Sequence, residues 1–171
     1  MNTGKGKYIL SAAIITILLI SDQVTKWLAL KHLAEGPKTV LPFLDFVLVW
    51  NRGISFGMFN QGHDYMPWVL SALSLIIVVG VTSWLIRTNH LPTIIALAAV
   101  ISGAIGNIID RIRFGAVVDF IDVHVKDWHY PAFNIADSAI VLGIAFIVLD
   151  GLFWEPKRRT VTNGTHIDIQ S

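Results

Sequence analysis

Four long apolar runs constrain the fold of this chain more than any other feature of its sequence. A helix that crosses a membrane needs about 20 mostly apolar residues, because each advances about 1.5 Å through a hydrocarbon core about 30 Å thick. Three runs reach or nearly reach that length, and the first does so if its helix continues through "DQVTKWLAL". The sequence therefore predicts an all-α membrane protein with a bundle of four transmembrane helices, over about residues 8–30, 66–86, 92–109 and 133–154.

The first run also fits a secretory signal peptide, since a basic start, an apolar stretch and a polar break are typical of one. No A-x-A-like cleavage site follows this run, and the next segment contains Lys26 within a helical continuation. We therefore expect the first run to be a transmembrane helix.

Composition limits the available chemistry. Cysteine is absent from the 171 residues, which excludes disulfides, thiol nucleophiles and Cys-based metal sites. Only 15% of the residues are charged, and the basic clusters at Lys5 and Lys7 and at 157–159 flank apolar runs rather than forming a nucleic-acid-binding surface. Any reaction must therefore use Asp, His, Asn, Ser, Lys or Arg.

The distribution of basic residues predicts the orientation in the membrane. Segments 1–7, 87–91 and 155–171 carry six of the 13 Lys and Arg residues, and the other seven are diluted over a longer stretch. This density favours both termini in the cytoplasm. We expect one membrane domain over 1–156 and a polar cytoplasmic tail over 157–171, to which the sequence assigns no role.

The two outer loops contain segments that resemble β-strands. "TVLPFLDFVLVWN", within 38–59, and "GAVVDFIDVHV", within 110–132, are rich in β-branched and aromatic residues. We expect them to pair into a small extracytoplasmic β-sheet. In the second loop, Asp122 and Asp127 are expected to be solvated acids.

Charged and amide residues recur where the predicted spans reach the outer membrane surface. An ionisable group at membrane depth is by default a functional hypothesis. In "GNIIDR", Asn107, Asp110 and Arg111 share one helical face, and in "NIAD", Asn134 and Asp137 do the same. These groups are therefore candidates for a site at the outer edge of the bundle.

Each group also has a structural interpretation. Asp22 and Lys26, four residues apart in "DQVTK", are expected to form an ion pair that anchors the first helix. Asp110 and Arg111 are equally consistent with an ion pair at the membrane interface and with residues that stabilise the end of the helix. Asp137 also reads as a helix N-terminal acid favoured by the macrodipole. That last interpretation leaves other polar residues of this edge unexplained.

Metal and serine chemistry are poorly supported. His124 and His129 share an acidic loop, but their spacing matches no zinc pattern, so we expect no metal and no cofactor. Ser55 and Ser138 lack a histidine at a recognised spacing, and "GISFG" is not G-x-S-x-G. What remains is the pair Asp119 and Asp137, because two nearby carboxylates share a proton and act in turn as base and acid.

Five motifs, in this order along the chain, resemble those of the prolipoprotein signal peptidases, the type II signal peptidases of bacteria. They are "DQVTK" at 22–26, "WNRGISF" at 50–56, "GNIIDR" at 106–111, "GAVVDF" at 115–120 and "FNIADS" at 133–138. The resemblance implies an inner-membrane aspartic endopeptidase whose outward-facing sheet holds the substrate. In that family the substrate is a prolipoprotein that carries a diacylglyceryl group on a lipobox cysteine, and the cut falls immediately before that cysteine.

The resemblance also implies roles for individual residues. The family's catalytic aspartates match Asp119 and Asp137. The supporting or substrate-orienting positions match Asp22, Lys26, Asn51, Gly53, Asn107, Asp110, Arg111 and Asn134. The expected partners are the lipid-modified prolipoprotein and membrane lipid, with no nucleic acid, and we expect a monomer.

Two other functions use the same residues. A proton-coupled transporter or channel would need polar groups through the membrane midplane, but the second span offers only Ser, Thr and Gly. A non-catalytic assembly factor would use the acids only to anchor helices. Asp119→Asn separates that function from an enzyme, since it keeps the shape of the side chain and removes its acid–base chemistry.

Overall fold

The structure is a computed structural model that describes residues 3–53 and 65–153. Four of its helices are long and apolar enough to cross a membrane, which confirms the four predicted spans. They are α1 (Thr3–His32), α2 (Met66–Arg87), α3 (Leu91–Phe114) and α4 (Ile135–Phe153). The part of the outer loop 38–59 that follows residue 53 and the predicted tail at 157–171 lie outside the described residues.

The helix ends differ from those expected. α1 runs without a break past both predicted limits, and α3 continues to Phe114 rather than ending near residue 109. α3 ends where Gly115 adopts a left-handed conformation (φ 68°) and its amide donates to the carbonyl of Arg111. A left-handed residue with such a bond is a common helix terminator. Asp110 and Arg111 therefore lie within the last turns of α3.

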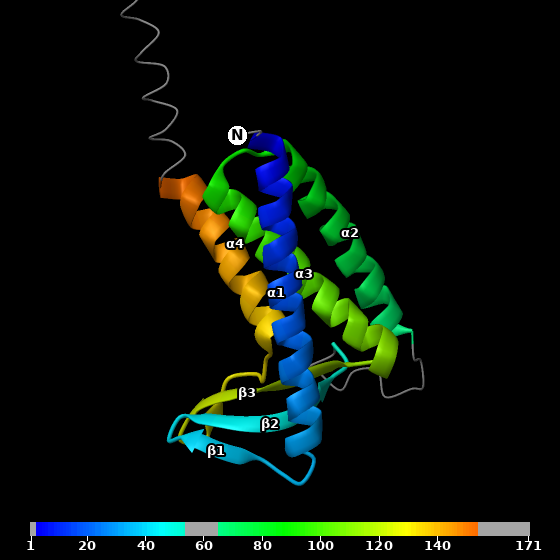
Figure 1. Ribbon diagram of the computed structural model, residues 1–171. Helices are drawn as coiled ribbons and strands as arrows, with labels where there is room; N and C mark the ends of the chain where they lie inside the picture. Colours follow the sequence, from blue (N-terminus) through cyan, green and yellow to red (C-terminus); the bar gives the residue numbers. More distant parts are fainter. Residues whose placement is uncertain (1–2, 54–64, 154–171) are drawn as a thin grey trace, which may run out of the picture.

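α3 is the central helix and contacts α1, α2 and α4 (Figure 1). Small residues on α3 allow this close packing, as is common between membrane helices. A side chain at Gly103 would meet the backbone carbonyl of Ala136 in α4, and one at Gly106 would meet the carboxylate of Asp22 in α1. These two glycines therefore let α1 and α4 approach α3 on the side where the polar residues gather.

A four-stranded antiparallel sheet lies at one end of the bundle, opposite the N-terminus of α1 (Figure 1). The strands, in the order β1-β2-β3-β4, are β1 (Lys38–Leu41), β2 (Leu44–Asn51), β3 (Val117–Val125) and β4 (Trp128–His129). β2 and β3 come from the two predicted strand segments, so the expected pairing of the loops is confirmed.

The end of α1 packs against one face of this sheet. Ala29 of α1 and Leu33, the residue after the helix, form a buried cluster with Phe120 of β3. The ring of Phe46 in β2 packs at a tilt against the ring of Phe120. Side chains alternate between the two faces of a strand. Asp119, the neighbour of Phe120, therefore points to the opposite face, toward the ends of α3 and α4.

Candidate active site

Asp119 lies on β3 where the sheet meets the helix bundle, and it is only 1% exposed. Its two carboxylate oxygens accept hydrogen bonds from two asparagines. Asn51 Nδ2 donates to Oδ2 at 2.9 Å, and Asn134 Nδ2 donates to Oδ1 at 2.7 Å. The carboxylate is therefore removed from water but held at both oxygens.

Asp137 is in the first turn of α4, and Asn134 immediately precedes that helix. The Asp137 amide donates to Asn134 Oδ1 at 2.8 Å, and the Asn134 amide donates to Asp137 Oδ2 at 3.3 Å. This reciprocal pair is a capping box, which satisfies two amides that the first turn of a helix leaves free. The expected role of Asp137 as a helix N-terminal acid is thus present in the structure.

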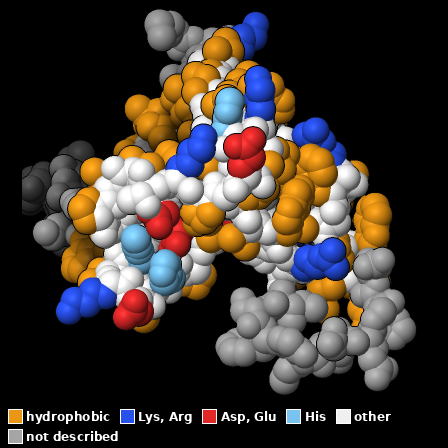
Figure 2. Space-filling view, turned by 90° about the horizontal axis from the view of Figure 1, so that it is seen from below, with side chains coloured by type: hydrophobic (Ala, Val, Ile, Leu, Met, Phe, Trp, Pro, Cys, Tyr) orange, Lys and Arg blue, Asp and Glu red, His pale blue; other side chains and the backbone are white. Residues whose placement is uncertain are grey.

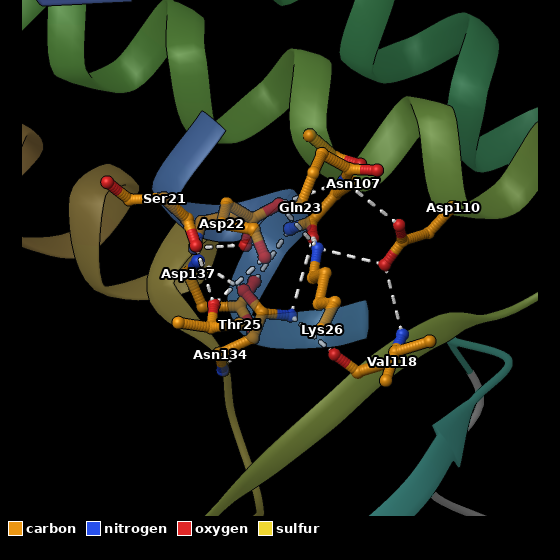
Figure 3. Close-up of polar contacts among 12 residues, drawn as sticks. Ser21, Asp22, Gln23, Thr25, Lys26, Asn107, Asp110, Val118, Asn134 and Asp137 are labelled. Carbon is orange, nitrogen blue, oxygen red and sulfur yellow. Dashed lines mark hydrogen bonds and ion pairs between the residues drawn. The ribbon is translucent and has the colours of Figure 1, made fainter. Parts of the chain in front are cut away.

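Asn134 also connects the two candidate catalytic aspartates. It is fully buried, with its amide nitrogen bonded to Asp119 and its amide oxygen bonded to the backbone of Asp137. On the other side, Asn107 Nδ2 donates to Asp137 Oδ1 at 2.7 Å (Figure 3). The two acids are therefore oriented by side chains that are themselves held in place.

Burial raises the pKa of the Asp119 carboxyl from 3.8 to about 6. Hydrogen bonds from Asn51 and Asn134 oppose this rise, whereas the negative charge of Asp137 adds to it. Asp137 is thus close enough for its charge to act on Asp119. Arg111 is half-buried on α3 and interacts electrostatically with both acids and with Asp110, most strongly with Asp137.

Lys26 lies at the centre of a second, adjoining cluster (Figure 3). It is 2% exposed, and its ammonium contacts Asp22 at 2.9 Å, Asp110 at 2.8 Å and the Asn107 side-chain oxygen at 3.1 Å. A lysine has three donors, and these three contacts use them all. Lys26 thus orients the amide of Asn107, which in turn holds Asp137.

The acids bonded to Lys26 join four elements of the fold. Asp22 Oδ1 accepts the amide of Ala136 at the start of α4 (2.9 Å), and Asp110 Oδ2 accepts the amide of Val118 in β3 (3.1 Å). The expected Asp22–Lys26 ion pair is confirmed, but it lies inside the bundle rather than at its surface.

β2 ends at Asn51, and Gly53 follows two residues later, at the margin of the site. Asn51 Oδ1 accepts the amide of Gly53 at 2.8 Å, which forms an Asx turn. Gly53 has φ 82°, a conformation that glycine adopts without strain, and a side chain there would meet Leu70. This turn leaves Asn51 Nδ2 free to bond Asp119.

Sequence reasoning missed Gln23 and misjudged two acids. Gln23 Nε2 donates to Asp22 at 3.1 Å and to Asp110 at 3.2 Å, and its place inside "DQVTK" was the available signal. Asp110 makes its ion pair with Lys26 rather than with Arg111, because α1 packs against this face of α3. Asp122 is buried rather than solvated, since β4 folds back and His129 Nδ1 lies 2.8 Å from its carboxylate.

The histidines lie on the sheet, away from the aspartate pair. His124 Nε2 is 3.8 Å from Asp45, and the ring centroids of His124 and His129 are 5.0 Å apart. Figure 2 shows histidine and acidic side chains gathered at one edge of the sheet end. Within residues 3–53 and 65–153, no group of three or more His, Asp or Glu side chains is placed to hold a metal ion.

Of the two serines considered as nucleophiles, Ser55 and Ser138, the structure describes only Ser138. Ser138 donates its hydroxyl to the Asn134 carbonyl at 2.9 Å, as part of the start of α4. Ser55 lies outside the described residues.

The chain resembles known proteins over most of its length. The family model described as signal peptidase (SPase) II matches residues 14–153, which include every candidate site residue. A lipoprotein signal peptidase from Polynucleobacter necessarius is 43% identical over 80% of this chain and 85% of the relative. One from Methylorubrum extorquens is 39% identical over 92% of this chain and 94% of the relative.

A solved structure has the same architecture. A bacterial membrane enzyme determined by the in meso method superposes with a TM-score of 0.76 at 30% identity, over 85% of this chain and 94% of that one. The sequence and structural matches agree, and the chain therefore belongs to the signal peptidase II family of proteases.

Proposed function

We propose that this protein is a membrane-embedded aspartic endopeptidase that removes the signal peptide from diacylglyceryl-modified prolipoproteins, cutting immediately before the lipidated cysteine. Membership of the signal peptidase II family supports the substrate class. The observation that carries the aspartic mechanism is the single buried Asn134 side chain that binds both Asp119 and the Asp137 backbone.

In this proposal one of the two carboxylates holds the shared proton. Asp119, whose pKa is raised to about 6, carries it and protonates the carbonyl oxygen of the scissile bond. Asp137 receives hydrogen bonds from Asn107 and from the Asn134 amide, and it takes a proton from the attacking water. As the C–N bond breaks, Asp137 passes this proton to the leaving amine nitrogen, and Asp119 recovers its own proton from a hydroxyl of the tetrahedral intermediate, which becomes the new carboxyl group. Asn51 is exposed, so a substrate carbonyl is able to displace it from Asp119.

A cavity beside Asp137 suggests how the substrate approaches. It has a volume of about 520 Å³ and is lined by the segment 130–133 and by Asp137, Ser138, Val141 and Leu142 of α4. Val141 and Leu142 are 62% and 68% exposed, on an apolar helix that crosses the membrane. A peptide held in the bilayer by acyl chains would therefore reach Asp137 from the lipid side.

The remaining parts of the proposal follow from the same arrangement. Residues 1–156 act as one domain, with both termini in the cytoplasm and the sheet on the outer side of the bacterial inner membrane. The residues that support the aspartates or orient the substrate are Asp22, Lys26, Asn51, Gly53, Asn107, Asp110, Arg111 and Asn134. One chain supplies both aspartates, so we propose that it works as a monomer among membrane lipids.

Cleavage of a purified diacylglyceryl-modified prolipoprotein by the detergent-solubilised protein tests this function. Asp119→Asn and Asp137→Asn should each lower the rate by a factor of roughly 10² or more, the contribution of one acid or base group. Asp127 is an exposed acid in the turn between β3 and β4, and Asp127→Asn is the matched control, which should cleave as wild type does. Folded aspartate variants that still cleave at the normal rate would disprove the aspartic mechanism, and an inactive wild type would disprove the substrate.

A further inference from the structure

A groove lies between the C-terminal end of α1 and the strands beside it, at the end of the bundle that carries the sheet (Figure 1). Its volume is about 280 Å³, and its lining comes mainly from α1, β1, β2 and β3. Neither Asp119 nor Asp137 lines this groove, so it is separate from the proposed catalytic site.

The walls of this groove are apolar. Leu33 and Phe120 are buried at its base, and Leu28 and Phe46 line it while remaining 41% and 37% exposed. Thr25 also lines it, but the Thr25 hydroxyl lies within hydrogen-bond distance of two backbone carbonyls of α1, at 2.8 and 2.9 Å. Covering apolar walls with hydrocarbon removes them from water, so the groove suits an apolar chain rather than a polar ligand.

The groove lies where the first membrane span reaches the interface between hydrocarbon and water. The span in α1 ends at His32, which lines the groove. Trp27 is 57% exposed near the same end of the helix, and tryptophan is enriched at the level of the lipid headgroups. A lipid molecule of the adjacent leaflet therefore has both its chains and its headgroup at the depth of the groove.

The mouth of the groove is basic. His32 and Lys38 line it, and Lys31 lies beside His32 in the last turn of α1. The segment 31–38 contains two lysines and a histidine against one acid, Glu35. No acid is among the described residues that line the groove. Ammonium and imidazole N–H groups are donors to phosphate oxygens, so an anionic headgroup complements this mouth.

We propose that this groove binds an anionic phospholipid of the surrounding bilayer. Part of one acyl chain lies between Leu28 and Phe46 and over Phe120, and the phosphate contacts Lys38 and the ring of His32. The small volume admits only part of one chain, and the rest of the lipid stays in the bilayer. A lipid with a net negative charge is preferred, because the ammonium group of a zwitterionic headgroup is repelled by Lys38.

Native mass spectrometry of the delipidated, detergent-released protein tests this proposal, with phosphatidylglycerol and phosphatidylethanolamine as probes. Wild type should bind phosphatidylglycerol more tightly. Lys38→Gln should weaken that binding about fivefold, the contribution of one basic group beside an anionic lipid, and should change phosphatidylethanolamine binding by less than about twofold. Lys126→Gln removes an exposed lysine from the turn between β3 and β4 and should match wild type.

A second variant tests the apolar wall independently of charge. Leu28→Asn puts a polar group where the acyl chain lies and should weaken phosphatidylglycerol binding about threefold. Leu75→Asn, at an exposed position of α2, is its control and should match wild type.

Three results would overturn the proposal. The first is equal binding of the two lipids by wild type. The second is unchanged phosphatidylglycerol binding in both Lys38→Gln and Leu28→Asn, or an equal loss in Lys126→Gln. The third is soluble glycerol phosphate that binds as tightly as the lipid, since the ligand would then be a free phosphate compound.

Discussion

Replacing Asp119 with asparagine should abolish cleavage and at the same time stabilise the protein at neutral pH. The wild-type carboxyl has a pKa of about 6 in the folded protein against 3.8 for the ordinary group. Folding therefore favours the protonated form, and the contribution of this group to stability is present below pH 3.8 and lost as the pH rises through about 6. Asparagine carries no charge and avoids this loss.

The magnitude follows from the size of the pKa shift. A rise of about 2 pKa units corresponds to about 3 kcal/mol at high pH, at 1.36 kcal/mol per unit. Asparagine has one acceptor oxygen where aspartate has two, so Asn51 or Asn134 loses its partner. Asn51 is exposed and is able to turn to water, which limits this cost to about 1 kcal/mol. The net stabilisation should be about 2 kcal/mol above pH 6, should vanish between about pH 4 and 5, and should become a net loss of about 1 kcal/mol at lower pH.

Thermal unfolding of the detergent-solubilised protein between pH 4 and 8 measures this difference. The melting temperature of Asp119→Asn should exceed that of wild type by several degrees at pH 8, and the gap should close as the pH falls. Asp127→Asn is the control, because it removes the same charge from an exposed position in the turn between β3 and β4. A gap that is constant with pH would refute the argument that burial of the Asp119 charge destabilises the fold.

Three other substitutions test the framework of the site. Lys26→Met should destabilise the protein by about 3–5 kcal/mol, because it leaves two buried carboxylates without their cation. Its control is Lys31→Met at an exposed position, which should change the free energy of unfolding by less than about 0.5 kcal/mol. Gly106→Ala should separate α1 from α3 and lower the melting temperature, whereas Gly80→Ala, which meets nothing within 4 Å, should be neutral or slightly stabilising. Asn134→Ala should lose about 1–2 kcal/mol through the lost helix cap and should also slow cleavage, so equal cleavage at normal stability would argue against its orienting role.

The membrane architecture was largely predictable from the chain alone. Apolar runs of about 20 residues have few options besides spanning a bilayer, and the first helix passes through Asp22 and Lys26 as expected. Contacts between residues three or four apart were also predictable, since the helix itself sets them. The Asp22–Lys26 pair and the cap at Asp137 are of this kind.

The tertiary structure alone decided how these local groups combine. Asp110 had an adjacent arginine but pairs with Lys26 from α1, 84 positions earlier in the chain, because Gly106 lets the two helices meet. Asn134 reaches Asp119 only because β3 turns back directly after α3. Burial of Asp119, and with it the raised pKa, depends on the sheet closing over the bundle end. Residue spacing determines neighbours within one helix, but the packing of separate elements determines which charges are shielded from water and which partners they find there.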